Sequence, residues 1–242
     1  MMKRIMGERL PSVVRRLGTL SEVKAALDWD GHLIGADLSG AILTGIDLSG
    51  ISLRSACLRG CDLVRSRLDC ADLRLADLTG SRLMGAHMHG TLLAGAVLDG
   101  AELSGADMRD ADLRGVRAMS LVAQGGTIEG CQLWGADMPR ADLRAATVRA
   151  SDLRGISLSG SGLEGIRIER CDLKVASFQG AELSRATLLA CDLRAARFDE
   201  ARLVDTSLRR SDLRGASFKR ARLDGLQLAE ARLGEVDFSE AV

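Results

Sequence analysis

Residues 101–115 read AELSG ADMRD ADLRG, three units of five residues with one shared pattern. Each unit opens with Ala, continues with an acidic residue and places a large apolar residue third. The pattern extends in both directions without an insertion or a deletion. Positions 33, 38, 43 and so on to 238 hold Leu, Met, Ile, Val or Phe at 40 of 42 places, and Ala118 and Ala123 are the exceptions.

A period of five residues fits neither an amphipathic helix, with period 3.6, nor a strand, with period 2. It indicates a chain that turns a corner after every five residues, with the small first residue and the large third residue pointing inward. The other three residues then face solvent, which explains the polar residues and many of the 27 Gly. One unit buries almost nothing by itself, so the units must stack to make a core.

A second period, of twenty residues, is superimposed on the first. Positions 33, 53, 73 and so on to 233 are all Leu, and the four Phe are Phe178, Phe198, Phe218 and Phe238. Stacked strands lie about 4.8 Å apart, so we expect these rings to form a ladder. The sequence predicts an all-β solenoid of about ten coils and a rod about 50 Å long.

The A-D-L-x-x pattern, as in Ala36-Asp37-Leu38 and Ala111-Asp112-Leu113, resembles the pentapeptide-repeat family over residues 33–238. The resemblance implies a right-handed quadrilateral β-helix with four repeats, or 20 residues, in each coil. It is specific for the fold and much less specific for a function.

Residues 1–30 lack the repeat. Thr19-Leu20-Ser21-Glu22 is typical of a capping box that opens a helix. Pro11 and Gly18 are placed to begin and end an earlier helix. Because a solenoid needs its open end covered, we predict a helical N-terminal cap over residues 1–30, including Trp29, and a repeat domain over residues 31–242.

Composition narrows the classes of partner and the compartment. The chain has 33 basic and 33 acidic residues, so net charge gives no reason to expect direct binding to nucleic acid or to a membrane. It has no signal-peptide pattern and no apolar run of about 18 residues. Its six Cys show no framework of disulfides. We expect a cytoplasmic protein whose inward Cys61, Cys131, Cys171 and Cys191 are reduced and act as small apolar residues.

Catalytic constellations are not visible in the sequence. His87 and His89 point outward on either side of Met88, and no third residue is placed to complete a metal site with them. The Gly residues recur by fives as corner residues and do not form a phosphate-binding loop. We therefore expect no enzyme activity, no cofactor and no metal.

Charged residues flank the all-Leu positions in two files. An acidic file precedes these Leu residues and a basic file follows them, as in Asp152 and Arg154. Two interpretations stay open: the files pair with each other for stability, or they form a binding surface. Trp134 takes the place of a basic residue between Arg114 and Arg154, either as a binding anchor or packed on its neighbours.

The segment 116–126 is irregular because Ala118 and Ala123 occupy positions of large residues. Either the coil narrows there or the chain loops out. Met119 and Val122 then add apolar surface near Trp134. We predict a partner-binding surface made of Trp134, Arg114, Arg154, Asp152, Met119 and Val122.

The family resemblance implies several roles without catalysis. Some members resemble duplex DNA and bind DNA gyrase or another topoisomerase, protecting it from its poisons, and others are effectors, adaptors or immunity proteins of secretion systems. The adjacent basic file works against a DNA mimic, which needs a continuous negative surface. Our leading hypothesis is a protein-binding module that neutralises or protects a partner, such as an immunity protein for a bacterial toxin. The alternatives are a topoisomerase-binding DNA mimic and a secretion adaptor, and a homodimer through the C-terminal coil is also expected.

Overall fold

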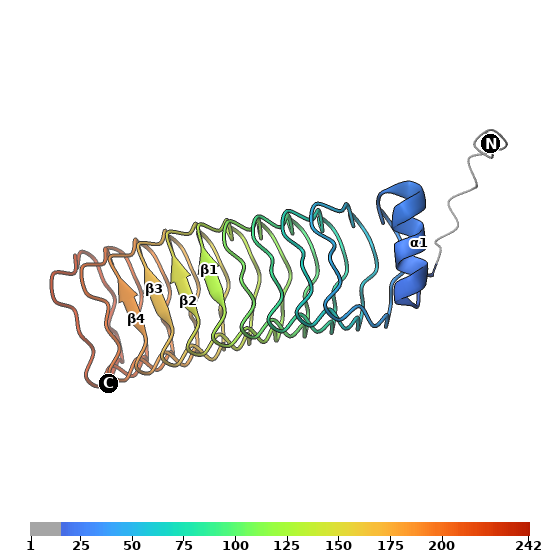
Figure 1. Cartoon of the computed structure of the whole chain (residues 1–242). Coiled ribbons are helices and arrows are strands. Elements are labelled where there is room, and N and C mark those ends of the chain that lie inside the picture. Colours follow the sequence, from blue (N-terminus) through green and yellow to red (C-terminus); the bar gives the residue numbers. More distant parts are fainter. Residues whose placement is uncertain (1–15) are drawn as a thin grey trace, which may run out of the picture.

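The computed structural model describes residues 16–242 and shows a straight rod of stacked four-sided coils with one helix at its N-terminal end (Figure 1). The chain is a right-handed quadrilateral β-helix, as the five-residue repeat predicted. We name its sides by their central residues. Face A is centred on residues 33, 53 and so on to 233, face B on 38 to 238, face C on 43 to 223, and face D on 48 to 228.

Each corner of the coil is a tight turn whose last residue lies in the left-handed region. Every fifth residue from Gly35 to Glu240 has a positive φ, and 21 of these residues are not Gly. At the first of these corners the amide of Ala36 donates to the carbonyl of Leu33 at 3.1 Å. This geometry turns the chain sharply enough to close a square in four repeats.

Backbone hydrogen bonds join each coil to the next with a register of twenty residues. The amide of Leu153 donates to Asp172 of the following coil at 2.8 Å, and the amide of Asp152 donates to Cys131 of the preceding coil at 3.0 Å. On face D the pairing is regular enough to form strands β1 (Thr127–Glu129), β2 (Thr147–Arg149), β3 (Arg167–Glu169) and β4 (Thr187–Leu189). They make one parallel sheet in the order β1-β2-β3-β4.

The core is a narrow column of first and third residues. Leu residues at third positions, such as Leu53 and Leu193, are fully buried. The predicted aromatic ladder is present on face B, because the rings of Phe178, Phe198 and Phe218 stack with centroids 4.8 and 4.7 Å apart. Phe238 continues the stack at 5.2 Å from Phe218 but is 39% exposed.

The irregular segment 116–126 stays in the coil. Ala118 and Ala123 are buried, and their amides donate to the next coil at 2.8 Å each. Val116 and Leu121 occupy the first positions of these two repeats and are also buried. The large side chain has therefore moved from the third position to the first, and the alternative of a looped-out chain is wrong.

Helix α1 (Leu20–Asp30) lies against the first coil (Figure 1). Its predicted capping box is present, since the Glu22 amide donates to Thr19 Oγ1 and the Thr19 amide donates to the Glu22 carboxylate. Val23 and Ala26 are buried in the core, but Trp29 is 88% exposed. The interpretation of Trp29 as a covering residue is wrong because it lies in the last turn, away from the buried side of α1. The proposed earlier helix, from Pro11 to Gly18, falls mainly outside the described residues.

The C-terminal coil leaves apolar side chains uncovered. Leu233 and Phe238 are 51% and 39% exposed, and Leu223 and Leu228 are half-buried. A homodimer through this coil stays a prediction. In residues 16–242 no helix is long and apolar enough to cross a bilayer.

The aromatic ladder gives a stability test. Phe198→Ala should lower the free energy of unfolding by about 3–5 kcal/mol, because it removes a fully buried ring between two stacked neighbours. Phe238→Ala is the matched control and should cost clearly less, since its ring contacts a neighbour on one side only. Chemical unfolding followed by circular dichroism measures both, and equal losses would show that the ladder is not a stabilising column.

Candidate functional site

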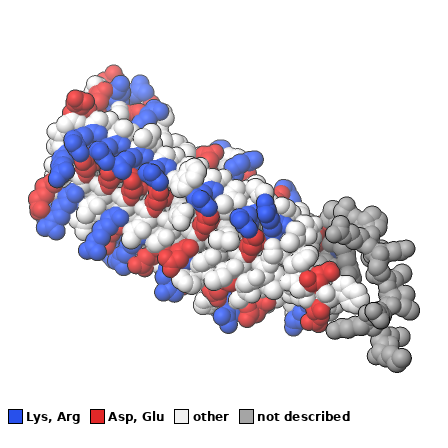
Figure 2. Space-filling view, turned by 90° about the horizontal axis from the view of Figure 1, so that it is seen from above, with Lys and Arg blue, Asp and Glu red and all other residues white. Residues whose placement is uncertain are grey.

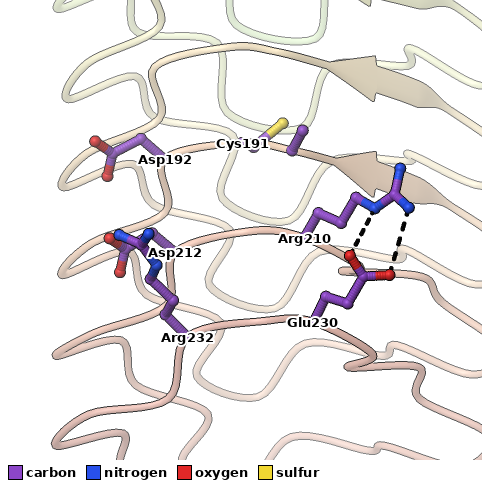
Figure 3. A pocket seen from close by; sticks show the side chains of 7 residues that line it. Cys191, Asp192, Arg210, Asp212, Glu230 and Arg232 are labelled. Atoms are coloured by element: carbon purple, nitrogen blue, oxygen red, sulfur yellow. Dashed lines mark hydrogen bonds and ion pairs between the residues drawn. The ribbon is translucent and has the colours of Figure 1, made fainter.

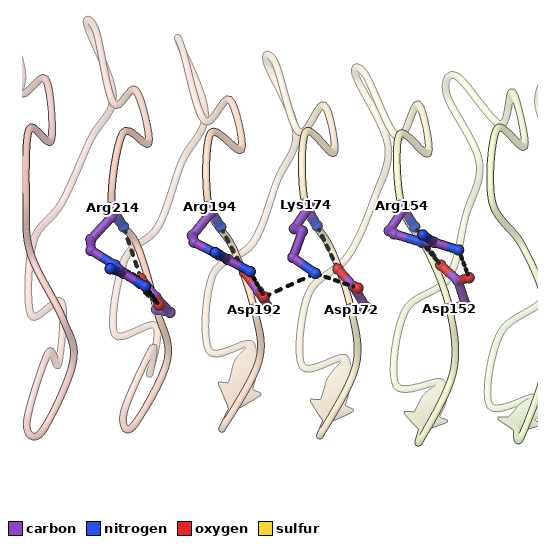
Figure 4. A network of polar contacts seen from close by, with 8 residues as sticks. Asp152, Arg154, Asp172, Lys174, Asp192, Arg194 and Arg214 are labelled. Carbon is purple, nitrogen blue, oxygen red and sulfur yellow. Dashed lines mark hydrogen bonds and ion pairs between the residues drawn. The ribbon is translucent and has the colours of Figure 1, made fainter.

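Every aspartate of the acidic file on face A pairs with the basic residue two positions further on in its own coil. Figure 2 shows basic and acidic side chains in adjacent rows along the C-terminal half of the rod, and Figure 4 shows their contacts. Asp152 Oδ1 accepts from the Arg154 amide at 3.2 Å and from Arg154 Nε at 2.8 Å, while Oδ2 accepts from a terminal guanidinium nitrogen at 2.6 Å. This arrangement recurs in Asp72–Arg74, Asp112–Arg114, Asp192–Arg194 and Asp212–Arg214.

The repeat itself creates these pairs. The second and fourth residues of a repeat both point outward from the same face of the coil. The short carboxylate of the second residue can therefore accept hydrogen bonds from both the backbone amide and the guanidinium of the fourth. Lys174 links neighbouring coils, because its Nζ lies 2.8 Å from Asp172 and 3.3 Å from Asp192. Of the two interpretations of the charged files, pairing is the one that the structure shows.

Pairing also lowers the pKa values of the aspartates. Hydrogen bonds from Arg194 lower the pKa of Asp192 from its ordinary value of 3.8 to about 2, with further contributions from Lys174. The hydrogen bonds from Arg154 likewise lower the pKa of Asp152. Both carboxylates are therefore ionised at neutral pH and committed to their basic partners.

Gln132 and Trp134 interrupt this series of Asp–Arg pairs. Gln132 and Trp134 stand in the second and fourth positions, where the flanking coils have Asp and Arg. Arg114 and Arg154, on either side, are each held by the aspartate of their own coil. The indole is left 47% exposed. The repeat pattern predicted the outward Trp134, whereas the loss of the aspartate was missed, although Gln132 at the second position of that repeat gave the signal.

The structure does not bring the other predicted site residues to one face. Met119 is a fourth residue of face B, at the next corner from Trp134, and is 39% exposed. Arg140 donates to its sulfur at 3.1 Å and partly covers it. Val122 lies on face C and is half-buried. The compact candidate surface is therefore Trp134 with Arg114, Arg154 and Asp152.

The family model for Pentapeptide repeats matches residues 32–69, 56–93, 81–117, 127–160, 151–188 and 191–225, in 8 copies. The chain belongs to the pentapeptide repeat family.

Solved pentapeptide repeat proteins resemble the chain at low identity. HetL, described as involved in heterocyst differentiation regulation in the cyanobacterium Nostoc sp., is 24% identical, with 93% of this chain and 96% of HetL covered and a TM-score of 0.44. Trypsin-treated QnrB1, a plasmid-mediated fluoroquinolone resistance protein, is 17% identical, with 83% and 92% covered and a TM-score of 0.43. No curated protein matches the sequence.

The cysteines of this pentapeptide repeat protein are unpaired throughout residues 16–242. Cys61, Cys131, Cys171 and Cys191 are buried in first positions, as the repeat predicted. The thiol of Cys131 donates to the carbonyl of Met108 at 2.7 Å, and burial raises its pKa to about 12. These thiols are protonated at neutral pH and are not poised as nucleophiles.

The corner between faces D and A has a hollow of about 460 Å³ (Figure 3). It forms at the small Ala190, beside the long side chain of Arg210 in the next coil. Arg210 pairs with Glu230 at 3.0 Å. Asp192, Asp212 and Arg232 complete the polar lining, so the charges of the hollow nearly balance.

His87 and His89 are exposed on either side of the buried Met88. His89 Nδ1 lies 3.6 Å from the Asp110 carboxylate, and the backbone of His87 pairs with Arg67 and Asp107 of the neighbouring coils. Within residues 16–242, no three His, Cys, Asp or Glu side chains are grouped so that they could hold a metal ion.

The paired aspartates predict a loss of stability in acid. Because the folded pKa of Asp192 is lowered to about 2, its contribution is present above the ordinary value of 3.8 and disappears as the pH falls through about 2. Asp192→Asn should therefore flatten the dependence of unfolding free energy on pH in this window. Asp205→Asn is the control, since Asp205 has no ion pair within residues 16–242. Urea unfolding at a series of pH values measures the slopes, and identical slopes for the two variants would contradict the assignment.

Proposed function

We propose that this chain is a non-enzymatic module that binds another protein through face A around Trp134. The observation that carries the proposal is the exposed indole at the one coil between residues 112 and 214 where face A lacks an Asp–Arg or Asp–Lys pair. Large aromatic residues concentrate binding energy when a partner encloses them. The ion-paired coils on each side form a polar rim, as is usual around such an anchor.

The fixed arginines favour a protein partner with a defined shape. Arg114 and Arg154 are held by bidentate contacts to Asp112 and Asp152, so a partner meets them in set positions and little side-chain freedom is lost on binding. Each guanidinium keeps donors that do not point at its aspartate. Such a surface selects a partner by geometry and hydrogen bonding more than by net charge.

Within this role, we propose that the chain neutralises or shields the activity of its partner protein. An immunity protein that binds a bacterial toxin acts in this way. Binding without chemistry is sufficient for that role, and a rigid rod presents its surface without rearrangement. The paired aspartates of face A speak against the alternative of a DNA mimic for DNA gyrase, because duplex mimicry requires acidic groups free of nearby cations. The unpaired cysteines support a reducing compartment, which we propose is the cytoplasm.

Trp134→Ala should weaken partner binding by about 2 kcal/mol or more, because it removes the anchor of the interface. It should leave the melting temperature almost unchanged, since the side chain is outside the core. The partner is first captured from lysate of the native cell with the full-length chain as bait, identified by mass spectrometry and purified. Titration calorimetry then compares wild type with Trp134→Ala.

Gln179→Ala is the matched control, because it removes a side chain at the same fourth position of a repeat but on face B, about two coils further along the rod. It should bind like wild type. Equal affinities of wild type and Trp134→Ala would remove face A as the docking surface. A partner that turns out to be a nucleic acid would overturn the proposed class of function.

A further inference from the structure

Face D of the C-terminal half differs from face A in how its basic residues are held. Arg167, Arg170, Arg185 and Arg209 are all exposed. Within residues 16–242, none of their side chains has a carboxylate within ion-pair distance or a hydrogen-bond acceptor. We call these four residues the face D arginine cluster.

The strand register brings the cluster together. Arg167 lies in β3 and Arg170 directly follows that strand. Arg167 pairs with Thr187 of β4, two residues after Arg185, and Thr187 pairs with Ser207, two residues before Arg209. All four arginines therefore fall within two coil-to-coil steps, about 10 Å along the rod.

The repeat explains why these arginines are free. On face A of the C-terminal half, Arg154, Arg194 and Arg214 each follow an aspartate in the second position, whereas Arg209 follows Ser207. Arg170 and Arg185 are fifth residues at corners, outside the second and fourth positions that create the pairs. Arg167 has a possible partner in Glu169, two positions further on, but the Glu169 carboxylate accepts from Arg149 of the preceding coil at 3.2 Å.

Glu169, Glu230 and Asp205 do not pair with the cluster. Glu169 and Glu230 are occupied by Arg149 and Arg210. Asp205 occupies the same corner as Arg185, one coil further on, but its carboxylate lies over Gly225, on the side away from Arg185. Positive charge is thus unbalanced on this part of face D, in a chain whose formal net charge is zero.

We propose that the face D arginine cluster binds an acidic segment of a partner protein. Guanidinium groups bind carboxylates with two parallel hydrogen bonds, and four unengaged groups on and beside the sheet of face D offer several such contacts at once. Half-buried hydroxyl groups of Thr187 and Ser207 lie between the arginines and add donors. Duplex DNA fits less well, because it demands a longer basic track than the roughly 10 Å found here.

The surface is separate from Trp134 and does not depend on it. Trp134 belongs to face A in the repeat of residues 131–135, whereas the cluster begins at Arg167 on face D. The two surfaces can therefore be tested independently with the same purified chain.

The test uses a fluorescein-labelled peptide of ten glutamates and fluorescence anisotropy at low ionic strength. The double variant Arg167→Gln/Arg209→Gln should bind the peptide at least tenfold more weakly than wild type. The control Arg194→Gln/Arg214→Gln removes the same amount of charge from ion-paired positions of face A, and should change affinity less than twofold. Trp134→Ala should bind like wild type, and thermal unfolding should be the same for Arg167→Gln/Arg209→Gln and wild type.

Three results would overturn the proposal. Wild type could fail to bind the peptide, or the two double variants could lose affinity equally, which would mean that only net charge matters. A labelled DNA duplex of twenty base pairs could bind wild type more tightly than the peptide and lose that binding in Arg167→Gln/Arg209→Gln, which would make the cluster a nucleic-acid surface.

Discussion

The left-handed residue at every corner is the constraint on which the rest of the structure depends. It turns the chain after each wall of three residues, so that four repeats close one coil and residue n lies beside residue n + 20. The parallel hydrogen bonds, the apolar columns and the aromatic ladder all require this fixed register. Glycine adopts the conformation most easily, yet Val175 has a φ of 59° at one corner. The hydrogen bonds on both sides of that corner hold a conformation that a branched residue avoids by itself.

The same register arranges the exposed side chains in lines along the rod. Any residue type that recurs every twenty positions becomes a line along the rod, with a spacing of about 4.8 Å. Like charges in such a line repel, and the pairing of second with fourth residues offsets this repulsion on face A. Where the pairing lapses, the surface acquires a different chemistry. At Gln132 and Trp134 the lapse exposes an aromatic ring, and around Arg167 and Arg209 it leaves guanidinium groups free.

Rigidity links this order to binding. Since each coil contacts only its neighbours, the rod holds its surface groups on a regular backbone without long loops. A partner therefore meets positions that are set before it arrives, and less conformational entropy is lost than with mobile loops. The cost is that the interface cannot adapt, so specificity depends on which side chains interrupt the repeat. Trp134 and the face D arginine cluster are two such interruptions on different faces.

The sequence by itself determined the coil, the inward and outward positions, the stacking of Phe178 to Phe218 and the capping box at Thr19. These follow from short-range periodicity, because a repeat without insertions gives every residue the same environment as its equivalent in the next coil. Only the tertiary structure decided the details that depend on side-chain direction. It showed that Leu121 is buried in the same repeat as Ala123 and that Glu169 turns to Arg149 instead of Arg167. Which partner a side chain contacts depends on the distances to several competing groups within a few ångströms. A repeat pattern does not contain those distances.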